Sequence, residues 1–145
     1  MSKKQWIITA AVVLAIVTAL CVFYVPRSVE RTVNLPDSEP LFIQAFVSDE
    51  VNTIIGYKTE DAEEMAAFLA ALQPVEMRYI NRKSVYEVGE VGADVFIRYE
   101  DGSDLRIYLS NNGAVRYDNK NYKCNDPAAL KGLLPQIESW ASFGG

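Results

Sequence analysis

Side chains that could carry out chemistry are few in this chain, and their types exclude several reaction classes. The 145 residues contain no histidine. Serine and cysteine nucleophiles that depend on an imidazole base are therefore excluded, as are zinc sites with imidazole ligands. Cys124 ends a stretch in which alternate residues are apolar, and this parity places its thiol in the core. We predict a buried structural thiol rather than a nucleophile or redox centre.

Two acidic clusters are the next candidates for catalysis or metal binding. Glu100, Asp101 and Asp104 crowd what reads as the tip of a hairpin. Their spacing does not match an EF-hand loop, and hairpin tips are exposed rather than pocketed. The acidic residues from Glu60 to Glu64 stand where a helical pattern begins, and the helix dipole favours carboxylates there. We predict no catalytic residue, no metal site and no cofactor.

A basic and aromatic set on alternating positions is the best candidate for recognition. Arg98, Arg106 and Arg116 alternate with apolar residues, so they share the sheet face that points away from the core. Tyr108 and Phe96 have the same parity. Guanidinium groups bind carboxylates and phosphates bidentately. The set is a candidate surface for a protein or an anionic small-molecule ligand; neutralisation by acidic residues of the same face is the alternative explanation.

The registers of three predicted hairpins decide which of these side chains meet. We expect a three-residue loop at Asp101-Gly102, another over Asn111-Asn112-Gly113, and a two-residue turn at Asn119-Lys120, because these keep all apolar residues on one face. The cross-strand pairs that follow are Arg98 with Arg106, Phe96 with Tyr108, Tyr108 with Arg116, Tyr99 with Leu105, and Tyr117 with Tyr122.

The elements that must position these residues form an α+β domain. Leu41 to Val47 reads as an interior strand, and Met65, Phe68, Leu69 and Leu72 form the apolar stripe of a helix that Thr59 caps and Pro74 ends. Val75 to Ile80 reads as a strand, and Asn81 to Gly92 as a polar connection. We predict a mostly antiparallel sheet with a C-terminal four-stranded meander and two helices packed on one face. Pro135 is expected to kink or divide the last helix.

A second region of the chain is strongly apolar. Residues 6–25 contain no charge, and a helix of that length spans about 30 Å, the thickness of the hydrocarbon core of a bilayer. An uncleaved transmembrane signal anchor fits this length better than a secretory signal does. Two alternatives stay open: cleavage of the segment, and lipidation at Cys21, although the bulky Leu20 departs from the small residue expected there.

The sequence therefore divides into three parts. Residues 1–25 are a cytoplasmic flank and anchor, 26–40 a stalk that contains Pro26, Pro36 and Pro40, and 41–145 a single extracytoplasmic domain. Lys3 and Lys4 precede the span, so we expect a cytoplasmic N-terminus and a single-pass protein of the cell membrane.

The charge of the part beyond the span limits its partners. That part has 12 Lys and Arg against 19 Asp and Glu, a net charge of −7. Nucleic acid is excluded as a partner, and flat docking onto anionic lipid is disfavoured, because both would repel the domain. Cys124 is its only cysteine, so no disulfide forms within the domain, which suits a bacterial surface.

The layout resembles small membrane-anchored exported domains of unknown function from Gram-positive bacteria. The matching stretches are YKTEDAEEMAAFLAAL, VFIRYEDGSDLRIYL and NNGAVRYDNKNYKC. The resemblance implies an anchored surface protein and transfers no functional residue. We therefore expect a non-enzymatic binding or interaction module; a carboxylate-dependent hydrolase or transferase and a structural subunit of a membrane complex are the alternatives.

Overall fold

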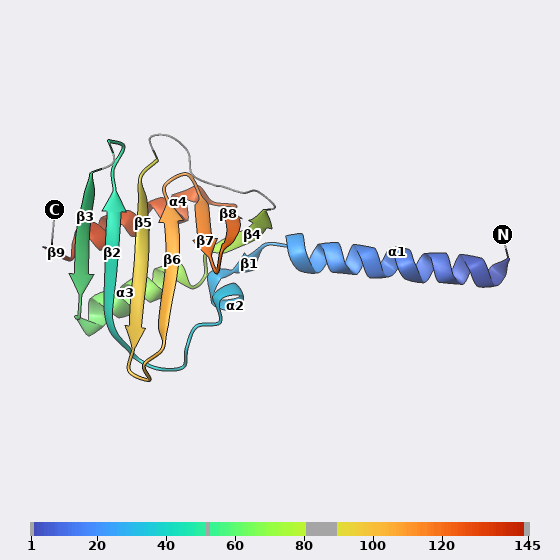
Figure 1. Ribbon diagram of the computed structural model, residues 1–145, viewed down its shortest axis with the longest axis horizontal. Coiled ribbons are helices and arrows are strands. Elements are labelled where there is room, and N and C mark those ends of the chain that lie inside the picture. The colour runs from blue at the N-terminus through green and yellow to red at the C-terminus, as the bar shows by residue number, and fades with distance from the viewer. Residues whose placement is uncertain (1, 52, 81–89, 144–145) are drawn as a thin grey trace.

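The apolar N-terminal stretch forms one long helix, α1 (Lys3–Tyr24), that projects from the rest of the chain (Figure 1). The computed structural model describes residues 2–51, 53–80 and 90–143. Ser2 caps the helix by accepting a hydrogen bond from the backbone N–H of Gln5, whose side chain accepts one from the Ser2 N–H. Pro26 ends it, because the residue before a proline avoids the helical conformation and Val25 is extended. No residue of the segment Lys3–Val22 is buried, and the segment is long and apolar enough to span a membrane.

The other elements build one nine-stranded antiparallel sheet. Its strands are β1 (Arg27–Ser28), β2 (Pro40–Ser48), β3 (Ile54–Thr59), β4 (Glu76–Ile80), β5 (Gly92–Tyr99), β6 (Asp104–Ser110), β7 (Ala114–Tyr117), β8 (Lys120–Cys124) and β9 (Ala141–Phe143). Their order across the sheet is β1-β4-β8-β7-β6-β5-β2-β3-β9. The predicted α+β class is confirmed. A four-stranded meander does not describe the sheet, because pairing continues on both sides of β5 to β8.

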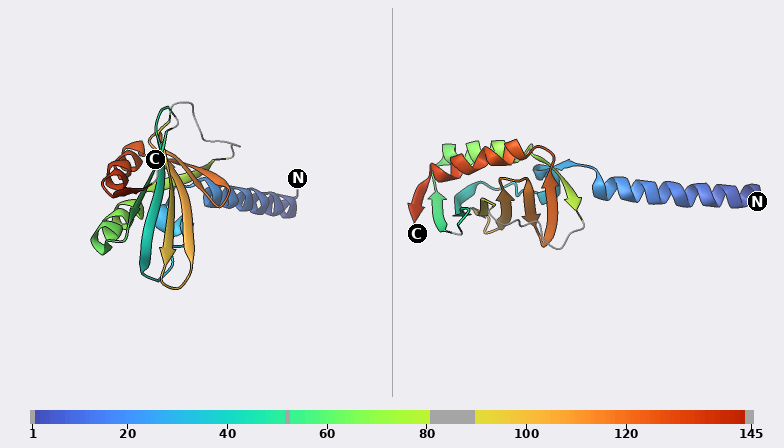
Figure 2. Two further views of the ribbon diagram at one scale, coloured as in Figure 1. Left: turned by 60° about the vertical axis from the view of Figure 1, so that its left-hand side comes forward. Right: turned by 90° about the horizontal axis from the view of Figure 1, so that it is seen from above.

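Three of the helices that the structure describes cover one face of this sheet. They are α3 (Ala62–Leu72), α4 (Pro127–Lys131) and α5 (Leu133–Glu138), which form a layer on the same side (Figure 2). The first of them begins two residues later than predicted, since Asp61 rather than Thr59 caps it by accepting from the Glu64 N–H at 2.9 Å. The last helix divides at Gly132, and Pro135 lies in the first turn of α5, where a missing N–H costs nothing.

The predicted stalk over residues 26–40 is wrong for its first half. Arg27 and Ser28 pair with β4 at the edge of the sheet, and α2 (Val29–Val33) follows. Val29 is fully buried and Val33 is 2% exposed. The i, i+4 spacing of these two valines holds the segment against the core, so only Val25 and Pro26 separate α1 from the domain.

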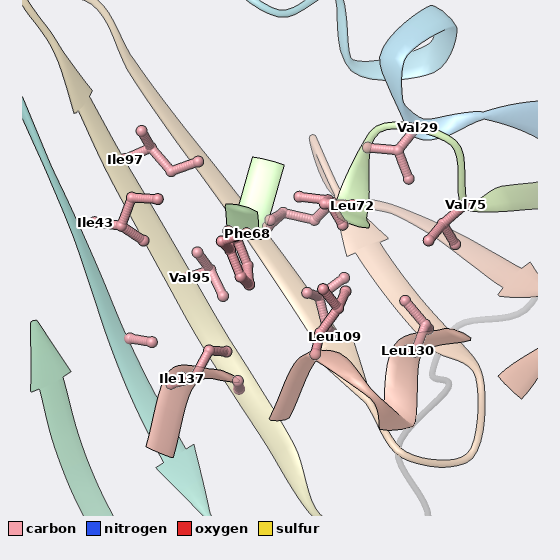
Figure 3. Packing of buried hydrophobic residues seen from close by; sticks show 14 of the residues in the cluster. Val29, Ile43, Phe68, Leu72, Val75, Val95, Ile97, Leu109, Leu130 and Ile137 are labelled. Atoms are coloured by element: carbon pink, nitrogen blue, oxygen red, sulfur yellow. The ribbon is translucent and has the colours of Figure 1, made fainter. Parts of the chain in front are cut away.

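One apolar core lies between the sheet and its helix layer. Phe68 and Leu72 of α3 and Ile137 of α5 point toward strand residues such as Val95 and Ile97 (Figure 3). Phe68 packs against Trp140 edge to face, with ring centroids 5.3 Å apart. This burial fixes which side chains of every strand must point to the other face. The predicted polar connection runs from Asn81 to Gly92, and residues 81–89 of it lie outside the described residues. Gly92 belongs to β5 instead, as its first residue.

Candidate binding surface on the uncovered sheet face

The uncovered face is the side of the sheet opposite α3, α4 and α5. No helix among the described residues covers it (Figure 2). Strand alternation brings every second side chain to this face. Arg98, Arg106 and Arg116 belong to it, as their parity predicted, and so do Phe42 and Phe46 of β2.

The registers of two of the three predicted hairpins are wrong by two residues. Tyr99 binds Ser103 across a loop of Glu100, Asp101 and Gly102, so Arg98 pairs with Asp104 instead of Arg106. In the last hairpin, the turn is Asp118-Asn119, and Tyr122 pairs with Val115 rather than Tyr117. The middle register is confirmed: Tyr108 pairs with Arg116. A shift of two keeps each side chain on its face, so the surface survives while its contacts change.

Arg98 is held by its own hairpin. One guanidinium nitrogen donates to the carbonyl of Gly102 at 3.3 Å, and another lies 3.7 Å from the Asp104 carboxylate. The guanidinium carbon also lies 5.6 Å from the centre of the Phe96 ring. The positive charge of Arg98 is therefore neutralised by an acidic residue of the same sheet face.

Arg106 and Arg116 differ from Arg98 in having no salt bridge within the described part of the chain. Both are exposed, and both line an open hollow of about 530 Å³ above β6, β7 and the turn that follows. Asp94, Asp118 and Asn119 line the same hollow. Two guanidinium groups thus face a space that a carboxylate-bearing group from a partner can enter.

Tyr108 lines the same hollow as Arg106 and Arg116 but is mostly buried. Its side chain is only 8% exposed, and its hydroxyl donates to Glu90 Oε1 at 2.6 Å. The other oxygen of that carboxylate accepts from Asn112 at 2.8 Å. The ring lies on Gly92, where an added Cβ would be 2.1 Å from the phenol oxygen. Tyr108 therefore forms part of the floor of the hollow beside β5, and little of its ring is open to a partner.

An aromatic half of the surface was missed by the sequence analysis. Phe42 lies 6.1 Å from Phe96, between ring centroids, and Phe46 packs edge to face against Phe143 at 5.6 Å. Phe46 is 42% exposed and Phe143 37%. Lys58 lies over the Phe42 ring, with Nζ 4.6 Å from its centre. Gln44 between the two phenylalanines of β2 was the available signal, since a polar residue in an apolar run marks a face turned to water.

The remaining candidates take structural positions. Cys124 is 2% exposed, and burial raises the pKa of its thiol, which donates a hydrogen bond to the Asp126 carbonyl at 3.1 Å. Glu100, Asp101 and Asp104 are exposed. Hydrogen bonds from Ser103 lower the pKa of Asp101. Among the described residues, no three His, Cys, Asp or Glu side chains gather closely enough to hold a metal ion.

Comparison of the chain with protein-family models, with curated proteins and with solved structures found no match. The surface joins an aromatic half, with phenylalanines from β2, β5 and β9, to a cationic half on β5, β6 and β7.

Proposed function

We propose that this chain is a single-pass membrane protein whose extracytoplasmic domain binds a protein partner through the uncovered face. One observation carries the proposal: exposed phenylalanines share a sheet face with two arginines that form no salt bridge to a described residue, and no described helix covers that face. Aromatic residues and arginine are the side chains enriched at the centres of protein interfaces.

The shape of the surface favours a protein over a small molecule. Ligand pockets enclose most of their ligand, whereas the hollow between Arg106 and Arg116 is open. The aromatic half lies beside it, since Phe96 pairs with Arg106 across β5 and β6. The arginines select a partner with carboxylates, and the phenylalanines select apolar side chains beside them. An acidic segment interrupted by apolar residues would satisfy both halves.

Membrane anchoring is the second part of the proposal. It is supported by α1, because no residue of its span-length segment Lys3–Val22 is buried in the domain. Orientation is tested with alkaline phosphatase fused after the last residue, because that enzyme is active only outside the bacterial cytoplasm. Active fusions place the domain outside; inactive fusions of an intact membrane-bound chain would place it in the cytoplasm. Release of the unfused protein by alkaline carbonate would contradict anchoring itself.

Binding is tested with the full-length protein extracted in mild detergent together with what co-purifies. We expect Arg106→Ser and Arg116→Ser, combined, to lose the co-purifying protein while the circular dichroism spectrum stays unchanged. Lys131→Ser is the control for the single Arg106→Ser change, since it removes one positive charge from the helix side. The proposal would be contradicted if Lys131→Ser lost as much of the co-purifying protein as Arg106→Ser does. It would also be contradicted if the double variant retained all of that protein.

A second candidate function has one observation in its favour. Asp94 and Asp118 line the same hollow as the two arginines, and paired carboxyls are what a hydrolase without histidine would use. The two candidate functions predict different effects of removing the negative charge of Asp94. Asp94→Asn should strengthen capture of an acidic partner by a binding module, since it removes like charge, whereas it would abolish turnover by a carboxylate enzyme.

A further inference from the structure

A second hollow lies at the junction of α1 and the domain. It measures about 320 Å³, at the lower end of the volumes of ligand sites. Val22 and Val25 reach it from the end of α1, and Met77 closes it from β4. Only Val25 and Pro26 separate α1 from β1 (Figure 1). Because Val22 and Val25 line the hollow, it lies at the end of the apolar span.

The polar lining of this junction hollow is cationic. Arg27 and Arg31 reach it from β1 and α2, and Lys120 reaches it from the start of β8. None of the three forms a salt bridge with another residue that the structure describes. The nearest acidic residues in the sequence, Glu30 and Asp118, do not line it.

Two tyrosines complete the wall. Tyr79 and Tyr122 pack edge to face, with ring centroids 5.9 Å apart. Tyrosine favours the headgroup level of a bilayer, where its ring is apolar and its hydroxyl is wet. The hollow therefore combines apolar residues at the end of the span with two tyrosine rings and three cations. A phospholipid offers matching chemistry in its acyl chains and its phosphate.

We propose that the junction hollow binds the phosphate headgroup of an anionic phospholipid from the leaflet next to the domain. The proposal rests on insertion of α1 in the membrane. The net charge of −7 beyond the span repels an anionic surface as a whole, but three cations gathered at the end of the span meet that surface first. Arginine binds phosphate bidentately and lysine as a point charge. The bound lipid fixes the orientation of the domain, with the β1–β4 edge toward the bilayer.

The occupant is tested with full-length protein reconstituted in vesicles of equal parts phosphatidylcholine and phosphatidylglycerol. After extraction in mild detergent, retained lipids are counted by mass spectrometry. We expect phosphatidylglycerol to be enriched. Arg27→Gln, Arg31→Gln and Lys120→Gln, combined, should lower its ratio to phosphatidylcholine by roughly tenfold, because each cation near a bilayer surface contributes to lipid binding.

The matched control is Arg78→Gln, Lys123→Gln and Lys131→Gln, which removes the same charge from exposed positions outside the hollow. This control should retain the enrichment. Lys120→Gln alone should give an intermediate ratio, which guards against misfolding of the triple variant. Equal ratios in the two triple variants, or no enrichment in the unaltered protein, would overturn the proposal.

Two further measurements separate the sources of failure. Stabilisation of the lipid-free protein by millimolar inorganic phosphate, lost in the Arg27, Arg31 and Lys120 variant, would show a soluble anion as the occupant and overturn the lipid assignment. Release of the unaltered protein from vesicles by alkaline carbonate would show that anchoring fails. Retention in carbonate without lipid enrichment rejects the lipid site alone.

Discussion

The same strands form both faces of the sheet, but side chains are buried on one face and remain partly exposed on the other. On the covered face, Val95 and Ile97 are fully buried against the helix layer. On the uncovered face, their neighbour Phe96 touches Phe42 and Arg98 and stays partly exposed. A residue's contribution to stability is thus set by strand parity rather than by its hydrophobicity, and the apolar residues left over on the uncovered face are available for recognition.

The largest expected effect contrasts the two faces with one residue type. Phe68→Ala should lower the free energy of unfolding by about 3–5 kcal/mol, because it opens a cavity in the core beside Trp140. Phe96→Ala should cost at most about 1 kcal/mol, since its ring is partly in water. Urea unfolding of the full-length protein in detergent measures both. Similar losses would mean that the two faces are equally packed.

Alkaline pH should act through the covered face. Burial raises the pKa of Cys124 above its ordinary 9.0 and those of Tyr99 and Tyr122 above 10.0, with the charges of Asp101 and Asp118 adding to the two tyrosine shifts. The unfolded chain therefore releases these protons first. Stability is retained below pH 9 and falls as the pH rises through 9 and 10 toward the folded values. Thermal unfolding between pH 7 and 11 measures this, and Cys124→Ala should remove the earliest part of the loss.

A smaller effect separates two tyrosines on opposite faces. The Tyr99 hydroxyl is buried with no hydrogen-bond partner among the described residues, whereas that of Tyr108 donates to Glu90. Tyr99→Phe should therefore raise the free energy of unfolding by about 1 kcal/mol, and Tyr108→Phe should lower it by about 1 kcal/mol. Urea unfolding decides the signs. Two changes of the same sign would contradict the assigned hydrogen bonding.

The smallest effect on stability is expected where the effect on binding is largest. Arg106→Ser and Arg116→Ser should each change the free energy of unfolding by less than about 0.5 kcal/mol, because both side chains are exposed and outside the salt bridges of the described residues. A loss of more than about 1 kcal/mol would show that these arginines stabilise the sheet instead of serving a partner.

Much of the fold could be predicted, because period-two alternation fixes faces without fixing contacts. Arg98 and Arg106 were placed on the correct face even though their register was wrong. The missed signal was Gly102, whose φ of +86° marks the last residue of a three-residue loop and so fixes the loop at residues 100–102. The same rule placed Gly113, with φ +93°, correctly. Asp118 and Asn119 both adopt positive φ, as a two-residue hairpin turn requires.

What could not be predicted depends on contacts between distant segments. Burial of Tyr108 follows from the carboxylate of Glu90 and the bare backbone of Gly92, neither of which is near it in sequence. Phe143 joined the surface because the short β9 pairs with β3 and its ring lies on Gly56, 2.8 Å from where a Cβ would be. The prolines of residues 26–40 favoured the prediction of a stalk. That prediction missed the two valines through which α2 packs against the core.

The most direct test of the uncovered face as a binding surface is site-specific photocrosslinking of the full-length protein in its own membrane. A photoreactive residue replaces Gln44, at the centre of the aromatic half, or Lys131, on the helix side. We predict one discrete protein adduct from position 44 that is lost with Arg106→Ser and Arg116→Ser, and none from position 131. No adduct at position 44, or the same adducts from both positions, would contradict the account.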